Sequence, residues 1–429
     1  MYKWKKYIPE GMRDILFEEC ISKVKIENEF RSLYLNAGFE EVISPTIEFY
    51  DVFNGEDQPM EQEKMYKLFD NQGRILVLRP DMTTPIARIA ATKLKDKGIP
   101  LKLCYTSNIF RINENFNGKM NEITQSGIEI IGTDNLKADA QVIIIGINAL
   151  LSAGLKNFKI ELGQAEFFKG LTEDVDMSFE DIEKLRNLIE NKNFASLKTF
   201  IDGNIEFIRP NAEAILRELP SLFGGIEVIK KAKEMTANKS ALEALESLEQ
   251  VYLMLDEIGL SSYLSIDLGM VHHINYYTGI IFRGYSNEVG NEILSGGRYD
   301  KLLGRFGDAM PATGLAINVD NILLSLKKQS NETKVQKTNF LIYYEKGFLK
   351  EAYNTAILIR RSNLEAELSV SEEYEEALKY AKSKNKKYFI TFSNDKRLVI
   401  KDLKNDEFEE LEISEFKEYL FNVIRRGIN

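Results

Sequence analysis

The feature that most constrains the fold of this chain is a strand-like stretch that runs from Leu101 to Gly132. It begins with LKLCYTSNIF and ends with ITQSGIEIIG, and both runs are rich in β-forming residues. The segment between them, RINENFNGKMNE, is polar and contains Gly118. Two such runs joined by turn-forming residues predict a long antiparallel hairpin. We therefore expect the surrounding chain to be organised around this hairpin.

Three polar residues of the hairpin form a candidate binding site. Arg111 closes the first strand, and Gln125 and Glu129 lie four residues apart on the second. Residues i and i+4 of a strand point to the same face of a sheet, so the amide and the carboxylate face the same way. A cation opposite an amide and a carboxylate could hold a zwitterionic small molecule. An exposed hairpin face with ordinary polar residues explains these residues equally well.

The composition is that of an ordinary soluble globular protein and limits its partners. The chain has 429 residues, enough for about two to three domains, with 44% hydrophobic and 28% charged residues. Its formal net charge of −10 disfavours polyanions, because an acidic chain repels phosphate backbones unless a local patch is basic. We therefore do not expect a nucleic acid as a partner.

The cysteines, histidines and apolar segments exclude several further classes of protein. Cys20 and Cys104 form no CxxC motif, which excludes a disulfide framework or thiolate metal site and fits a reducing cytoplasm. The only histidines, His272 and His273, are adjacent, so their side chains diverge and disfavour a metal site. The N-terminus has no apolar targeting segment, and no window approaches the roughly eighteen apolar residues of a membrane span. We expect a cytoplasmic protein without metal or cofactor.

Helix and strand patterns alternate on both sides of the hairpin. They predict a helix over residues 15–37, a strand ending near Pro45, a hairpin that turns at residues 71–73, a helix over residues 134–154 and a short strand in FKIELGQAEFF. From about 171 to 256 strand signals vanish and helical periodicity dominates. Strand patterns return in YLSIDLG, YYTGIIFRGYS and EILSGGRYD, and PATGLAINVDNILLSL reads as a strand that passes into a helix.

These changes of pattern predict the domain boundaries. We expect a core made of residues 1–170 and 257–326, an all-helical insertion at 171–256, a linker at 327–337 and a C-terminal α/β domain at 338–429. The linker is polar, charged and without periodicity. In the last domain FLIYYE, KYFITFS and RLVIKDL predict strands, and LKEAYNTAILIRRS and a final amphipathic segment predict helices.

Short motifs outside the hairpin contain further candidate ligand contacts, although no nucleotide-binding glycine loop, zinc motif or nucleophile elbow is present. Asp81 and Thr83 lie where a helix starts and are ordinary N-caps, but the Asp81 carboxylate could also face a ligand ammonium. The glycine pair in SGGRYD lets a ligand or another backbone approach, or forms a tight turn before a helix. Tyr276 and Tyr277 would place one ring on each face of a strand, either in a pocket or in the core.

The order of these motifs resembles that of a known family. RPDMTTPIARI, FRINENFNGKMNEITQSGIEIIG, INYYTGIIF and SGGRYDKLLGRFGDAMPATGLAI look like the motifs of histidyl-tRNA synthetases and their paralogues, the regulatory subunits of ATP phosphoribosyltransferase. The resemblance covers about residues 5–325. It implies the α+β fold of the class II aminoacyl-tRNA synthetases, with a mostly antiparallel sheet, flanking helices and a helical insertion. The tail from about residue 335 is more weakly similar to an anticodon-binding domain.

Several positions depart from the synthetase pattern where a synthetase binds ATP. The RGLDYYTG-type run becomes HHINYYTG at residues 272–279, with a histidine in place of the arginine. The adenosine-stacking arginine falls on Asn321, and the FRxE element ends at Asn113. The basic residues of the next loop fall on Lys119 and Asn121. Because charge builds on the ATP phosphates during adenylation, these losses imply a site that no longer activates an amino acid.

The amino-acid side of the site is better preserved. The resemblance implies that histidine binds to Asp81, Thr83, Arg111, Gln125, Glu129, Tyr276 and Tyr277. Asp81 replaces a glutamate and shortens its reach by one methylene, and Met82 replaces a glycine.

The departures favour a regulatory subunit over an enzyme. The resemblance implies a non-catalytic subunit for the first step of histidine biosynthesis, with histidine as effector. As partners it implies a short-form ATP phosphoribosyltransferase catalytic subunit, in a hetero-octamer, and a second copy in a self-dimer. Two alternatives stay open. One is a working histidyl-tRNA synthetase, which the tail favours because many regulatory subunits end near the core; the other is a stand-alone histidine sensor.

Overall fold

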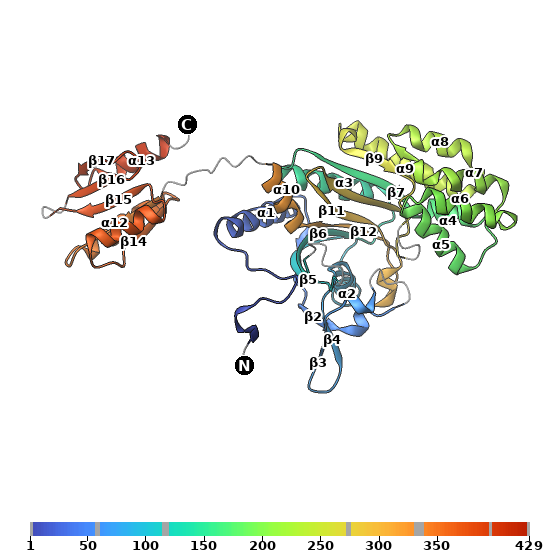
Figure 1. Ribbon diagram of the computed structural model, residues 1–429, viewed down its shortest axis with the longest axis horizontal. Coiled ribbons are helices and arrows are strands. Elements are labelled where there is room, and N and C mark those ends of the chain that lie inside the picture. The colour runs from blue at the N-terminus through green and yellow to red at the C-terminus, as the bar shows by residue number, and fades with distance from the viewer. Residues whose placement is uncertain are drawn as a thin grey trace. The chain divides into compact units, whose positions relative to one another are not determined.

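The computed structural model describes residues 3–55, 61–113, 120–271, 276–329, 339–393 and 397–426 (Figure 1). The chain divides into two compact units, Met1–Asn331 and Glu332–Asn429, each with its own sheet. The mixture of a mostly antiparallel sheet with flanking helices confirms the α+β prediction for the first unit.

The predicted hairpin lies inside a nine-stranded sheet. β5 (Leu101–Phe110) and β6 (Glu122–Ile131) pair antiparallel over their whole length, which confirms the prediction. The strands follow the order β1-β5-β6-β12-β11-β10-β7-β9-β8. The remaining bounds are β1 (Glu40–Glu41), β12 (Ala312–Asn318), β11 (Val289–Arg298), β10 (Ile280–Ser286), β7 (Phe158–Gln164), β9 (Leu264–Asp267) and β8 (Phe223–Gly224). Only the β1–β5 and β7–β9 pairs are parallel.

Helices cover both faces of this sheet because its strands carry apolar side chains on both sides. On one face, α1 (Phe17–Asn36), α3 (Leu136–Ser152) and α10 (Val319–Gln329) contribute to one large core with even-numbered residues of β6 such as Ile128. On the other face, α2 (Thr83–Lys93) packs with η7 (Leu302–Arg305) over odd-numbered residues of β5 such as Leu103. Figure 1 shows α2 on the opposite side of the sheet from α3. Gln125 and Glu129, also odd-numbered, therefore face α2.

A small three-stranded sheet precedes α2. It has the order β2-β4-β3, made of β2 (Ile47–Phe49), β4 (Ile75–Leu78) and β3 (Lys67–Phe69), with η2 (Tyr50–Val52) and η3 (Gln62–Lys64) in its connections. β3 and β4 form the predicted hairpin, and its turn contains Gly73 at a φ of 78°. Pro45 lies between β1 and β2, in agreement with a break in the strand.

The region predicted to be an all-helical insertion is helical with two exceptions, the strand β8 and an isolated β-bridge between Val175 and Ile208. It begins at the end of α4 (Ala165–Thr172) and includes α5 (Phe179–Glu190), α6 (Phe194–Gly203), α7 (Pro210–Glu218), α8 (Glu227–Met235) and α9 (Lys239–Glu257), with η4 (Ile205–Phe207) and η5 (Leu219–Ser221). Figure 1 shows these helices together beside β7 and β9. The expected absence of strands is wrong for β8, which pairs with β9 through Phe223 and Asp267. Two residues are too few to leave a strand signal in the sequence.

The second unit is an α/β sheet of order β14-β13-β15-β16-β17. Its elements are β13 (Asn339–Ile342), α11 (Leu349–Arg361), β14 (Glu365–Leu368), α12 (Tyr374–Ser383), β15 (Tyr388–Phe392), β16 (Leu398–Asp402), β17 (Glu407–Leu411) and α13 (Phe416–Arg426). The sequence did not predict β14 and β17, because EAEL and EFEEL are short and acidic. The predicted linker overlaps α10 at residues 327–329, and from residue 330 it lies outside the described residues.

Candidate functional site

A cavity of about 220 Å³ opens on the face of the large sheet that carries α2. Backbone of β11 and β12 forms part of its floor, including Gly296 and Gly314. The sequence-predicted residues that line it are Asp81, Thr83, Arg111, Gln125, Tyr276 and Tyr277. The fold thus brings together candidates from four separate parts of the chain. Glu129 is the one candidate that does not reach the cavity surface.

The N-terminus of α2 supplies the acidic side of the cavity. Asp81 Oδ1 accepts a hydrogen bond from the Thr84 amide at 2.8 Å, and its Oδ2 accepts one from the Thr84 hydroxyl at 3.2 Å. Asp81 lies one residue before the N-cap position, Met82, and accepts a hydrogen bond from the first turn of the helix, whereas Thr83 is the first helical residue and is not the cap. The Asp81 carboxyl group also lines the cavity. Burial raises the pKa of Asp81, although the Thr84 amide and the charge of Arg111 act in the opposite direction.

Arg111 and Gln125 supply donors to the cavity. Arg111 Nε donates to the Pro80 carbonyl at 2.7 Å, which anchors the side chain, while its two terminal nitrogens make no hydrogen bond with the residues that the structure describes. Burial lowers the pKa of Arg111, and the carboxylates of Asp81 and Glu292 oppose this shift. Gln125 Oε1 accepts the Met82 amide at 3.2 Å. Its amide nitrogen has no partner among the described residues and is available to an acceptor.

Glu129 lies beneath the cavity floor. Its side chain accepts hydrogen bonds from the hydroxyl of Thr83, at 3.0 Å, and from the hydroxyl of Tyr299. The residue is 1% exposed, and burial raises the pKa of its carboxyl group to about 8, against the two hydrogen bonds that lower it. The group is therefore mostly protonated at neutral pH. A Cβ atom at Gly314 would overlap Glu129 Oε2 and lie 2.6 Å from the Ile128 carbonyl, so only glycine fits there.

The two tyrosines do not lie on a strand. Tyr276 and Tyr277 precede β10 in irregular backbone, and both line the cavity, so the expectation of one ring on each face of a strand is wrong. Their rings meet edge to face with centroids 4.8 Å apart, and Tyr276 also stacks on Tyr299 at 6.0 Å. Because strand alternation stops before Ile280, the two side chains are free to point the same way.

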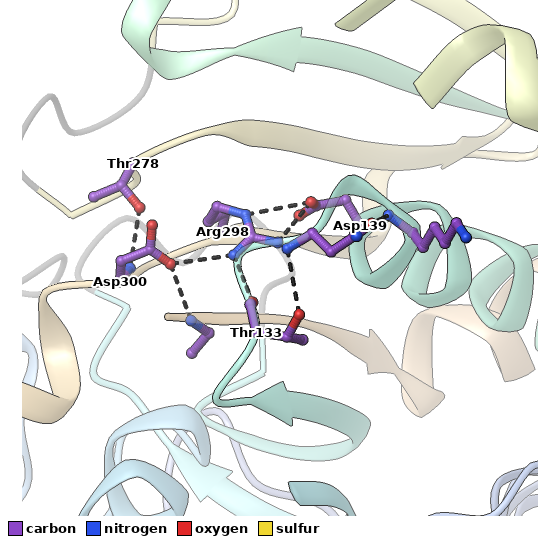
Figure 2. Close-up of polar contacts among 8 residues, drawn as sticks. Thr133, Asp139, Thr278, Arg298 and Asp300 are labelled. Atoms are coloured by element: carbon purple, nitrogen blue, oxygen red, sulfur yellow. Dashed lines mark hydrogen bonds and ion pairs between the residues drawn. The ribbon is translucent and has the colours of Figure 1, made fainter. Parts of the chain in front are cut away.

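A buried arginine holds the segment that carries these tyrosines (Figure 2). Arg298 Nη2 lies 2.6 Å from Asp139 Oδ2 of α3, and its Nη1 lies 3.3 Å from Asp300 Oδ1. The Arg298 carbonyl accepts the Thr278 amide at 2.8 Å, and the Thr278 hydroxyl accepts the Asp300 amide at 3.0 Å. The SGGRYD motif therefore serves in strand packing and in fixing Thr278, one residue after Tyr277. Its glycines lie within β11 and line the cavity, and they do not form a turn.

Sequence reasoning missed two charged residues of the cavity wall, Arg283 on β10 and Glu292 on β11. Arg283 Nη2 lies 3.1 Å from Glu190 Oε1, and its Nε lies 3.7 Å from Glu292 Oε2. Burial lowers the pKa of Arg283, but the neighbouring carboxylates outweigh it and raise the value. The available signal was a single arginine inside the otherwise apolar strand sequence IIFRGYS.

The part of the chain that the structure describes contains neither a membrane-spanning helix nor a cluster of metal ligands. None of its helices is both long and apolar enough to cross a lipid bilayer. No group of three or more His, Cys, Asp or Glu side chains lies close enough together to hold a metal ion within the same residues.

Comparison with known proteins decides the family. A family model described as histidyl-tRNA synthetase matches residues 11–322. The ATP phosphoribosyltransferase regulatory subunit of Clostridium botulinum is 53% identical over 421 residues, which cover 98% of this chain and 100% of that protein. The chain belongs to the family of ATP phosphoribosyltransferase regulatory subunits. The match extends through the C-terminal unit, so this regulatory subunit also has that unit. The expectation that the tail favours a synthetase is therefore wrong.

Solved structures agree with this family and its fold. The crystal structure titled an ATP phosphoribosyltransferase regulatory subunit/histidyl-tRNA synthetase from Bacillus halodurans C superposes with a TM-score of 0.81 at 32% identity, and covers 90% of this chain and 98% of that one. A histidyl-tRNA synthetase from Nostoc sp. PCC 7120 has a TM-score of 0.80 at 20% identity, covering 97% and 99%, and supports the fold alone. The class II synthetase fold predicted for this regulatory subunit family is thereby confirmed.

The asparagines at the positions that the resemblance assigns to the ATP site of a synthetase bind main-chain groups. Asn113 Nδ2 donates to the Met120 carbonyl at 2.8 Å, and Asn121 Oδ1 accepts the Asn113 amide at 3.0 Å. Asn321 Nδ2 donates to the Glu292 carbonyl at 2.7 Å. Each asparagine is committed to a neighbouring main-chain group. Two other departures, Lys119 and the histidine pair at 272–273, lie outside the described residues.

Proposed function

We propose that this chain is a non-catalytic subunit that associates with a short-form ATP phosphoribosyltransferase catalytic subunit, and that histidine binds in the cavity as its effector. The names of the relatives support the partnership. The cavity supports the histidine site, because the ammonium and the carboxylate of a buried amino acid both need partners of opposite charge.

The observation that carries the proposal is the charge arrangement of the cavity. The cavity of about 220 Å³ brings together the carboxyl group of Asp81, the amide nitrogen of Gln125 and the terminal nitrogens of Arg111, which bond to none of the described residues. An amino-acid ammonium is matched by Asp81, and its carboxylate by the forked donors of Arg111. Tyr276 and Tyr277 add flat apolar surface on which a planar side chain such as imidazole packs.

The proposed lack of catalysis follows from the residues that face a nucleotide in a synthetase. Adenylation concentrates negative charge on the ATP phosphates, and removing one stabilising donor typically costs roughly hundredfold or more in rate. Asn113 and Asn321 supply no charge and are engaged with main-chain carbonyls. Several such losses together leave too little stabilisation for amino-acid activation.

Regulation then follows from linkage between two binding events. If the catalytic assembly has an active and an inactive state, histidine shifts the equilibrium toward the state whose cavity binds it more tightly. The resemblance to the family adds a hetero-octamer, a self-dimer of this chain and a cytoplasmic location to the proposal. In that setting the pathway's end product controls its first step.

Three measurements on the purified chain test the proposal. Isothermal titration should detect histidine binding, and the chain should raise the turnover of a short catalytic subunit and make that turnover sensitive to histidine. ATP–pyrophosphate exchange with histidine should be absent at ordinary enzyme concentration. Measurable exchange would restore the synthetase alternative, and histidine binding without any effect on a short catalytic subunit would leave a stand-alone sensor.

A further inference from the structure

One helix of the insertion contacts the cavity wall at two points. Glu190, the last residue of α5, pairs through Oε1 with Arg283 at 3.1 Å. One turn earlier, Arg186 Nη1 lies 3.5 Å from the Val271 carbonyl, next to Met270, which lines the cavity. Arg186 and Glu190 are also paired with each other at 2.8 Å. The C-terminal turn of α5 is therefore tied to the wall by polar contacts that depend on charge.

The charges in this chain of contacts alternate, and with Glu183, which also pairs with Arg186 at 3.0 Å, the carboxylates outnumber the guanidinium groups. Arg186, Glu190, Arg283 and Glu292 follow one another, and the first three side chains are 9%, 18% and 18% exposed. Charges with so little solvent around them are screened weakly by salt. A ligand carboxylate near Arg283 adds to this excess of negative charge. The excess is relieved when one of the existing carboxylates weakens its hold on the guanidinium.

We propose that the carboxylate of the bound amino acid lies between Arg111 and Arg283 and competes with Glu190 for Arg283, so that filling the cavity loosens the C-terminal turn of α5. This inference rests on the proposed function, because it takes the amino acid as the occupant. It makes Arg283 a further ligand-binding residue. It also makes the helical insertion the element that responds to ligand binding. A ligand that weakens the Glu190–Arg283 ion pair favours a different arrangement of α5.

Histidine titration of the full chain and its Glu190→Gln variant tests the competition. Glutamine keeps the shape and one acceptor for Arg283 but removes the charge that competes with the ligand. Histidine affinity should rise about fivefold, which is what the loss of one competing, partly exposed ion pair allows. Glu183→Gln is the matched control, because Glu183 lies on the same helix and pairs with Arg186 at 3.0 Å but not with Arg283. Its affinity should equal that of the wild type.

Hydrogen exchange of residues 186–190 with and without histidine reads the response of α5. In the wild type and in Glu183→Gln, histidine should speed exchange in this turn several-fold, and in Glu190→Gln it should change nothing. Unchanged or weaker affinity in Glu190→Gln, or no response of α5 in the wild type, overturns the inference. If Glu190→Gln does not fold, Arg283→Lys decides: the loss of the forked donors should weaken histidine binding, and unchanged affinity refutes the role of Arg283.

The outcomes separate this inference from the proposed function. Histidine binding to the wild type without any response of α5 removes only the inference and leaves the histidine site intact. No histidine binding to the wild type removes both.

Discussion

The buried carboxyl group of Glu129 should make the stability of the first unit depend on pH. Its pKa rises from the ordinary 4.5 to about 8 in the folded chain, mainly through burial. Because the folded state then holds the proton more tightly than the unfolded state, this group costs nothing below about pH 4.5 and destabilises the fold increasingly as the pH rises toward 8. At about 1.4 kcal/mol for each pKa unit, the full window corresponds to about 5 kcal/mol.

The Glu129→Gln variant removes this ionisation while keeping the shape of the side chain. The glutamine oxygen can accept from one of the two hydroxyls that contact Glu129, those of Thr83 and Tyr299, and its amide can donate to the other. Between pH 5 and pH 8 the wild type should lose about 3 to 4 kcal/mol through this group. The variant should lose none of that amount, and should therefore be the more stable protein at pH 8.

Hydrogen exchange of the β6 amides under conditions where they exchange by unfolding is the suitable assay, because it reports on the first unit alone in a chain of two units. The control is Glu122→Gln on the same strand, whose carboxylate lies at the edge of the sheet face and accepts from Asn108 Nδ2 at 2.8 Å. The control should follow the wild-type pH profile. If Glu129→Gln also follows it in parallel, the carboxyl group is not protonated in the fold and the reasoning fails.

Three further substitutions test the site and its support. Arg111→Ala should lower histidine affinity at least tenfold in a calorimetric titration, because it removes the charged donors that match the carboxylate. Gly314→Ala should destabilise the first unit by more than about 2 kcal/mol in the same exchange assay, whereas Gly290→Ala, with open space around it, should be nearly neutral. Arg298→Met should cost about 3–5 kcal/mol by leaving Asp139 buried and unpaired, and adding Asp139→Leu should recover most of it; equal losses in single and double variants would contradict this.

Local patterns were sufficient to predict the parts of the site that depend on strand period and helix capping. The hairpin alternation placed Gln125 and Glu129 on one face, and the sheet register bears this out. The helix start after Asp81 followed from residue preferences at N-termini, and the helix begins at Thr83 with the Thr84 amide donating to Asp81. These features are decided within a few residues of the chain, so a sequence pattern contains them.

Features that depend on contacts between distant parts of the chain could not be predicted from local sequence patterns. The depth of Glu129 depends on Tyr299, which lies far along the chain, so spacing predicted its direction but not its burial. The direction of Tyr277 depends on the anchoring of Thr278 by the SGGRYD motif. Arg283 became a cavity residue only because β10 lies next to both β7 and β11 in the sheet. Such positions are fixed by strand order, which no local pattern encodes.

The asparagines at the positions that the resemblance assigns to nucleotide binding hold main-chain carbonyls in place, so the surrounding fold depends on them. Asn321 ties α10 to the Glu292 carbonyl of β11, and Glu292 is itself part of the charge balance around Arg283. An arginine introduced at position 321 would lose the amide that holds this carbonyl and would bring a second cation toward Arg283. The substitution would therefore disturb the cavity wall around Arg283 and Glu292 without creating a site for adenylation. Under the proposed non-catalytic function, one restored charge is too little for adenylation, so single charge restorations should leave ATP–pyrophosphate exchange undetectable.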